Sequence, residues 1–130
     1  MLNREILDAL PAVANRFEVE LEDSEKVVFA AEMRTFGDEK DGMLGTQGSK
    51  FTLTNRRIVA DNGLGVWTVQ IPDNLASCEM VTKKWLMFTS VYFLVMLNSD
   101  IVYDDGKGRL NGFRFYFDKK DTARLAELLV

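Results

Sequence analysis

One stretch, residues 48–61, constrains the fold of this 130-residue chain more than any other. Its first half alternates apolar and hydroxyl side chains, with Phe51 and Leu53 on one face and threonines on the other. That alternation is the two-residue period of a half-buried β-strand. Asn55 follows, a residue type that tolerates left-handed backbone and favours turns. A second β-rich run then passes through Ile58 and Val59, so the stretch predicts a tight β-hairpin.

The same reasoning predicts further strands on both sides of the hairpin. Short apolar runs recur along the chain, bounded by glycine, proline and asparagine. The run at 91–97 is apolar on both faces, which predicts that a terminal helix or another subunit covers its outer face. Residues 35–49 contain four glycines and are expected to form a long, mobile loop. The predicted strands are 27–33, the two of the hairpin, 66–71, 75–82, 91–97 and 112–117, with a further short run at 101–103.

Helices are predicted at both ends of the chain. Asn3 is a suitable N-cap, and an apolar stripe at helical spacing follows it: Ile6, Leu10, Val13 and Phe17. Pro11 falls inside this stripe, so it either kinks the helix or starts a second short one. Near the other end, Asp118 can cap a helix over residues 119–129. The inner face of that helix is formed by Thr122, Leu125, Ala126 and Leu129.

Composition excludes several classes of protein. The net charge of −4 argues against a general nucleic-acid-binding surface, which requires a dense basic face. The chain has no histidine, and Cys78 is its single cysteine, so a histidine-based triad and an internal disulfide are both ruled out. The longest apolar run, residues 85–97, is shorter than the roughly 20 residues of a spanning helix. We therefore expect a soluble, cytoplasmic protein with no nucleic-acid partner.

Several segments resemble a known family in sequence and in order. Residues 48–58, GSKFTLTNRRI, resemble the G-x-L-x-L-T-N-x-R-L-I hairpin of GRAM domains and of bacterial PH-like domains. Residues 21–28, LEDSEKVV, resemble the L-x-x-G-E-x-V segment that leads into the first strand, with Ser24 in place of the usual glycine. Residues 71–72 resemble the I-P step before the fifth strand, and residues 113–117 the closing strand. The resemblance covers residues 20–130.

The resemblance implies a mainly β fold. We expect a PH-like, partly open barrel of about seven antiparallel strands in two sheets, capped by a C-terminal α-helix. A curled sheet of this kind leaves one end of its core open to solvent, and a helix with an apolar stripe can cover that end. The N-terminal helix would be an addition. We expect one domain over 1–130, with a helical extension at 1–19 and the barrel with its C-terminal helix at 20–130.

Headgroup-binding members of the PH superfold use basic residues in the loop after the first strand and on the second strand. The corresponding candidates for an anion contact are Lys50, Arg56 and Arg57. The loop at 38–41 reads Asp-Glu-Lys-Asp and is acidic, while a polyphosphate needs several charge-assisted contacts. For the two arginines the simpler interpretation is that one is solvated and one pairs with a carboxylate.

A second candidate contact combines two lysines with four large apolar residues: Lys83, Lys84, Trp85, Leu86, Met87 and Phe88. The simpler interpretation is a strand extension whose apolar side lies in the core. The alternative is a partner or membrane contact, because aromatic residues and methionine are enriched in interface cores. Exposure discriminates between the two, since a large exposed apolar patch marks an interaction site.

The sequence therefore leads to three functional hypotheses. The first is a non-enzymatic PH-like interaction or scaffolding domain that acts through protein contacts, in particular self-association. The second is a peripheral membrane or lipid-binding module that uses residues 83–88. The third is a small barrel that binds an apolar ligand, or an enzyme without a recognisable motif. No cofactor, metal ion or catalytic residue is predicted.

Overall fold

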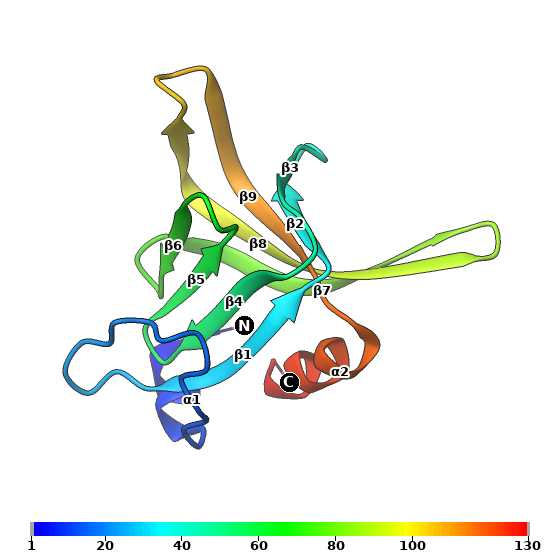
Figure 1. The fold of residues 1–130 in the computed structure, drawn as a ribbon. Coiled ribbons are helices and arrows are strands. Elements are labelled where there is room, and N and C mark those ends of the chain that lie inside the picture. Colours follow the sequence, from blue (N-terminus) through cyan, green and yellow to red (C-terminus); the bar gives the residue numbers. More distant parts are fainter. Residues whose placement is uncertain (1, 130) are drawn as a thin grey trace.

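The computed structural model describes residues 2–129 and consists of two antiparallel sheets with a helix near each end of the chain (Figure 1). The first sheet has the order β1-β4-β5-β6 and the second the order β3-β2-β9-β8-β7. The elements are α1 (Arg4–Ala9), β1 (Val27–Met33), β2 (Thr35–Asp38), β3 (Met43–Gly45), β4 (Ser49–Thr54), β5 (Arg57–Asp61), β6 (Val66–Gln70), β7 (Leu75–Trp85), β8 (Phe88–Tyr103), β9 (Gly108–Tyr116) and α2 (Lys119–Leu128).

The predicted mainly β architecture is confirmed, including the hairpin at 48–61, which forms β4 and β5 with Phe51 opposite Ala60. The chain bends at Arg34, so β1 pairs with β4 in one sheet while β2 pairs with β9 in the other. The chain thus passes from one sheet to the other at this bend, and the two sheets do not close into a single barrel.

The core between the sheets is rich in phenylalanine. Phe51 is fully buried and packs edge-on against Phe29, Phe93, Phe115 and Phe117, with ring centroids 5.0–6.4 Å apart. Such edge-to-face pairs contribute about 0.5–1.5 kcal/mol each beyond their burial. The hairpin strand therefore supplies the ring at the centre of the core.

The prediction of a long, mobile loop at 35–49 is wrong, because this segment contains β2 and β3, which bring the number of strands within residues 2–129 to nine. The Asp38 carboxylate accepts hydrogen bonds from the N–H groups of Lys40 and Gly42, each at 2.8 Å. The Arg114 guanidinium donates to the Asp38 carbonyl oxygen. A Cβ on Gly37 would lie 2.4 Å from the carbonyl oxygen of Gly42, so this glycine permits close strand approach.

The N-terminal helix is shorter than predicted. Asn3 caps α1 as expected, accepting a hydrogen bond from the N–H of Ile6, but the helix ends at Ala9. Leu10 is extended (φ −76°, ψ 146°), because the residue before a proline is pushed out of the helical region. No helix follows before β1, so Val13 and Phe17 do not belong to a helical stripe and the idea of a second short helix is wrong.

At the other end, Asp118 caps α2 as predicted by accepting a hydrogen bond from the N–H of Asp121. Leu125 is the residue of α2 that is fully buried in the core. On the outer face of β8, Tyr92 packs against the ring of Tyr116 on the neighbouring strand β9 and below the Arg114 guanidinium, while Leu94 and Met96 are half-buried. Coverage of this face by a terminal helix or another subunit stays a prediction. Within residues 2–129 no helix is long and apolar enough to cross a membrane.

Candidate interaction site: the projecting β7–β8 hairpin

The β7–β8 hairpin extends well beyond the rest of its sheet (Figure 1). The strands pair without interruption from Ser77↔Met96 to Trp85↔Phe88 and are joined by a turn of Leu86 and Met87. Leu86 takes a positive φ of 53°, as residues in tight hairpin turns often must. On its other side β8 begins to pair with β9 only at Phe93, so residues 88–92 have β7 as their single neighbouring strand.

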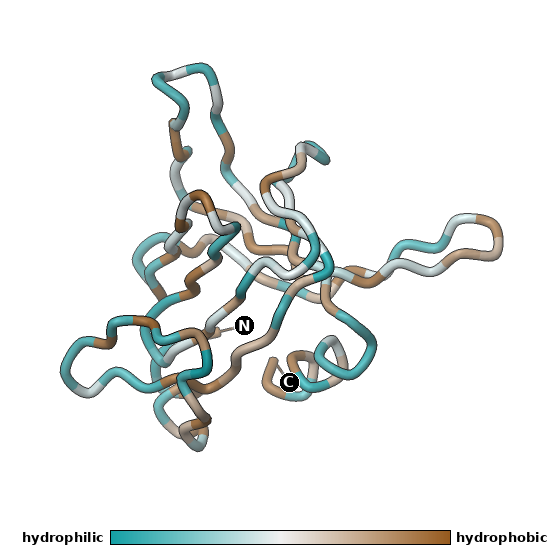
Figure 2. The backbone as a smooth tube through the Cα atoms, in the orientation of Figure 1, coloured by the Kyte–Doolittle hydropathy of each residue, from teal (hydrophilic) through white to brown (hydrophobic). Residues whose placement is uncertain are grey.

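The tip of this hairpin is apolar and exposed. Trp85, Leu86, Met87 and Phe88 expose 71%, 84%, 96% and 69% of their surface. The interpretation that placed these residues in the core is therefore wrong. Because β9 and the core end before the hairpin does, nothing else in the described chain reaches the tip. Figure 2 shows this apolar tip at the end of an otherwise polar projection.

The charges beside the tip have one sign. Lys83 and Lys84 lie on β7 directly before it, and both are exposed. The carboxylates nearest in sequence are Glu79 on β7 and Asp100 far along β8. The two lysines carry +2, so the remainder of the chain carries −6 of the overall charge of −4. The hairpin end is therefore a basic, apolar projection from an acidic domain.

β7 is also an edge strand, because it is the last member of its sheet. Its pairing partner is β8 alone, so every second residue directs its backbone N–H and C=O groups away from the sheet. Exposed edges of this kind are templates for pairing with another chain. Cys78 on this strand is half-buried, and burial raises the pKa of its thiol, so the cysteine is not an activated nucleophile.

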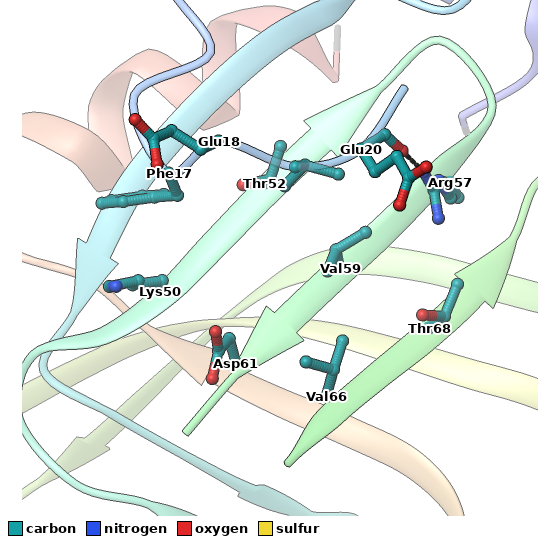
Figure 3. Close-up of a pocket in the computed structure, with 11 residues that line it drawn as sticks. Phe17, Glu18, Glu20, Lys50, Thr52, Arg57, Val59, Asp61, Val66 and Thr68 are labelled. Atoms are coloured by element: carbon teal, nitrogen blue, oxygen red, sulfur yellow. Dashed lines mark hydrogen bonds between the residues drawn. The ribbon is translucent and has the colours of Figure 1, made fainter. Parts of the chain in front are cut away.

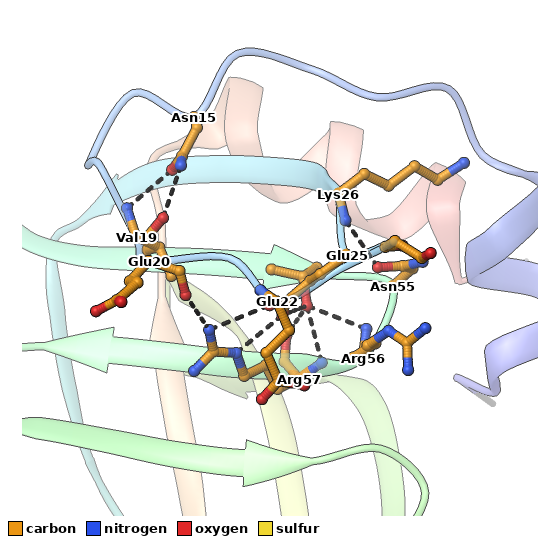
Figure 4. A network of polar contacts seen from close by, with 11 residues as sticks. Asn15, Val19, Glu20, Glu22, Glu25, Lys26, Asn55, Arg56 and Arg57 are labelled. Atoms are coloured by element: carbon orange, nitrogen blue, oxygen red, sulfur yellow. Dashed lines mark hydrogen bonds and ion pairs between the residues drawn. The ribbon is translucent and has the colours of Figure 1, made fainter.

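The predicted anion residues lie elsewhere, and Arg57 belongs to a buried network around Glu25 (Figure 4). The Glu25 carboxylate accepts hydrogen bonds from Arg57 Nε (2.8 Å), Thr54 Oγ1 (2.7 Å) and the N–H of Glu22 (2.9 Å). Burial alone would raise the pKa of Glu25, but these bonds and the charge of Arg57 outweigh it and lower that pKa. Arg57 is thus the arginine paired with a carboxylate. Its neighbour Arg56 has a buried Nε without a hydrogen-bond partner.

Asn55, in the turn of the β4–β5 hairpin, is buried and makes three side-chain hydrogen bonds. Its side chain accepts a hydrogen bond from the N–H of Lys26 (2.9 Å) and donates to the Ser24 carbonyl (3.2 Å) and to Asp8 Oδ1 (2.8 Å). The T-N-x-R residues and the glutamate before β1 therefore tie the β4–β5 turn to the start of β1. Their role in this structure is to hold the scaffold.

Lys50 lies with Arg57 at the rim of a hollow of about 270 Å³ on the outer face of β4–β6 (Figure 3). The same hollow contains Glu18, Glu20 and Asp61, so its carboxylates outnumber its cations. Lys50 Nζ lies 5.8 Å from the centre of the Phe17 ring. An anion contact at Lys50, Arg56 and Arg57 stays a prediction, and this charge balance does not favour it.

A wider groove, of about 900 Å³, lies between α2 and the base of the hairpin. Its lining combines the cations Arg34 and Lys119 with hydroxyl side chains and with apolar residues such as Met80 and Val91. Among residues 2–129 there is no group of three or more cysteine, aspartate or glutamate side chains placed to hold a metal ion.

Comparison with known proteins supports the fold. No protein-family model matches the sequence, and no curated protein matches it either. The structure is similar to that of the Vps36 N-terminal PH domain, with a TM-score of 0.62 and 15% sequence identity. The match covers 91% of this chain and 86% of the other. At this identity the similarity establishes a PH-like fold and nothing finer, so the affiliation with GRAM-like or bacterial domains stays a prediction.

Proposed function

We propose that this chain is a non-catalytic recognition module that acts through protein contacts, with self-association through the β7–β8 hairpin as its principal contact. The observation that carries the proposal is the combination of an exposed apolar tip and an unpaired edge strand on one projecting element. A PH-like fold is compatible with interaction or lipid-binding modules, but a fold does not determine a function. The proposal therefore rests on the projecting hairpin and not on the fold.

A comparison of free energies favours a contact that uses the tip of the hairpin and the edge of β7 together. Burying one large apolar side chain fully contributes about 1.5–3 kcal/mol, so the four tip residues supply roughly 6–12 kcal/mol at most. Association costs about 4–15 kcal/mol in lost freedom of motion, which leaves the tip alone marginal. Backbone pairing along β7 adds to the contact, because another extended polypeptide can form a ladder of hydrogen bonds with those N–H and C=O groups, which otherwise bond to water.

Measurement of mass in solution over a range of protein concentration tests this proposal. We expect sedimentation equilibrium to detect a reversible oligomer at micromolar concentration, weakened by the double variant Trp85→Ala, Leu86→Ala. Leu64→Ala is the matched control, because Leu64 is 98% exposed in the β5–β6 turn, away from the hairpin. A strict monomer up to hundreds of micromolar would overturn the proposal, as would equal weakening by the control.

A membrane contact is the second candidate function, and Lys83 and Lys84 beside the tip are the observation that favours it. Each lysine near an anionic surface contributes about 1 kcal/mol. Unpaired strand edges are not tolerated in hydrocarbon, so the free edge of β7 limits such insertion to the turn. Co-sedimentation with phosphatidylserine vesicles, compared with Lys83→Ala and Trp85→Ala, tests this candidate. No binding to these vesicles would exclude it.

A further inference from the structure

The pairing of β7 with β8 fixes which residues of β7 direct their backbone N–H and C=O groups to the free edge. Because a two-residue turn joins Trp85 to Phe88, this closing pair is a hydrogen-bonded pair. Alternation along the antiparallel ladder then makes Lys83↔Ser90 and Val81↔Tyr92 hydrogen-bonded pairs as well. The even-numbered residues of β7 alternate with these and direct their N–H and C=O groups to the free edge: Cys78, Met80, Thr82 and Lys84. An incoming strand must pair with these residues.

We propose that two copies of this chain pair antiparallel through β7 about a two-fold axis at Val81, which places Glu79 of each copy opposite Lys83 of the other. The inference rests on the self-association proposed above and specifies its site and register. An isologous contact is required when the same strand of both copies forms the interface, and it makes the pairing antiparallel. The two five-stranded sheets would then form one continuous sheet.

Two requirements select this register: opposite charges must face each other, and residues that direct backbone groups to the edge must pair with residues that do the same. Glu79, Lys83 and Lys84 are the charged residues of β7. Pairing about Met80 or Thr82 brings no opposite charges face to face, and pairing about Lys83 sets lysine against lysine, which is destabilising. Placing Glu79 opposite Lys84 would match an odd-numbered residue with an even-numbered one, so the hydrogen-bonding groups of the two edges would not meet. The axis at Val81 satisfies both requirements.

The faces of the strand agree with this arrangement. Met80 and Thr82 line the groove beneath α2, so the residues that alternate with them lie on the other face of the sheet. Glu79 and Lys83 are exposed on that other face, with the half-buried Val81 between them. In the pair, Val81 meets its own copy, flanked on each side by a Glu79–Lys83 contact. About eight backbone hydrogen bonds form along residues 78–84.

Site-directed disulfide formation tests the register. In a Cys78→Ser background, Val81→Cys brings two thiols together at the axis, where directly opposite Cα atoms in a non-hydrogen-bonded pair lie about 4.5 Å apart, within disulfide range. We expect rapid formation of a covalent dimer under mild oxidation. Ser77→Cys in the same background is the control, because Ser77 is exposed on the same face of the same strand, four residues from the axis. It should form no such dimer.

Charge reversal provides an independent test that needs no covalent bond. Glu79→Lys and Lys83→Glu should each raise the dimer dissociation constant by about tenfold or more, because two attractive pairs become repulsive. The double variant should restore the wild-type value. Glu79→Lys combined with Lys84→Glu should not, and near-ultraviolet circular dichroism checks that each variant is folded.

The outcomes separate this inference from the proposed function. If the wild-type protein forms an oligomer, but Val81→Cys forms no covalent dimer and the double charge reversal does not restore the dissociation constant, the register is wrong and self-association stands. A monomeric wild-type protein would overturn both.

Discussion

Replacement of Glu25 by glutamine would test the role of the buried network at the start of β1. The Glu25 side chain is fully buried and accepts four hydrogen bonds, two of them from Arg57, while Arg57 is 18% exposed. Glutamine retains one acceptor oxygen, so its amide group must face either Arg57 Nη2 and the N–H of Glu22, or Arg57 Nε and the Thr54 hydroxyl. In either orientation at least one donor from Arg57 loses its acceptor.

The magnitude follows from these contacts. A hydrogen bond to a charged group contributes about 1.5–3 kcal/mol, and a buried donor left without a partner costs about 1–3 kcal/mol. Removing one partner of a buried ion pair costs about 3–5 kcal/mol, and the partial exposure of Arg57 places Glu25→Gln near the lower end. We expect a loss of about 3 kcal/mol in the free energy of unfolding, and a decrease in Tm of about 10 °C.

Urea unfolding followed by tryptophan fluorescence measures this loss at neutral pH. Glu22→Gln is the matched control, because its side chain is exposed and only its backbone N–H joins the network, so we expect a change within about 0.5 kcal/mol. The same measurement at lower pH supplies a second test. The pKa of Glu25 is lowered in the folded state, so its stabilisation is complete above the unfolded-state pKa of about 4.5. The stabilisation is lost as the pH falls through the lowered pKa of Glu25.

The advantage of the wild-type protein over Glu25→Gln should therefore shrink at acidic pH. If Glu25→Gln were as stable as Glu22→Gln at neutral pH, the network would not stabilise the fold and the reasoning would be refuted.

Three further predictions concern the core, the C-terminal helix and the cysteine. Phe51→Ala removes the ring at the centre of the phenylalanine cluster and should lower the free energy of unfolding by about 3–5 kcal/mol, measured by urea titration. Asp118→Ala removes the cap of α2 and should cost about 1 kcal/mol in the same assay; no change would show that α2 forms without its cap. Cys78 should react with iodoacetamide more slowly than a free cysteine at pH 8, because burial raises the pKa of its thiol; an equal rate would contradict that assignment.

Local patterns in the sequence were sufficient for much of the fold. The alternation around Phe51, the turn at Asn55 and the phenylalanines of the closing strand predicted strands that the structure contains. The cap at Asp118 was also correct, because capping depends on residues close in sequence. The segment 35–49 was misjudged for the opposite reason. Its glycines suggested a loop, but pairing with β9 and a close backbone approach at Gly37 make the same residues a strand.

In the candidate site, too, local sequence was informative and contacts between distant segments were not predicted. Sequence alone singled out residues 83–88 as a candidate contact and left open whether their apolar side chains were buried. It also suggested that one of two adjacent arginines pairs with a carboxylate, without identifying Glu25, which lies 32 residues from Arg57. The free edge of β7 was not foreseen, because the position of a strand in its sheet depends on the order of all the others.

The sequence by itself determined where most of the strands and turns form, though not β2 and β3, because those choices depend largely on side-chain alternation and on local backbone preferences. Only the tertiary structure decided that Trp85, Leu86, Met87 and Phe88 are exposed. Their burial depends on how far β9 and the core extend beside β7 and β8, and β9 pairs with β8 only from Phe93 onward. Exposure of the tip is therefore set by the relative lengths of strands that are distant in sequence.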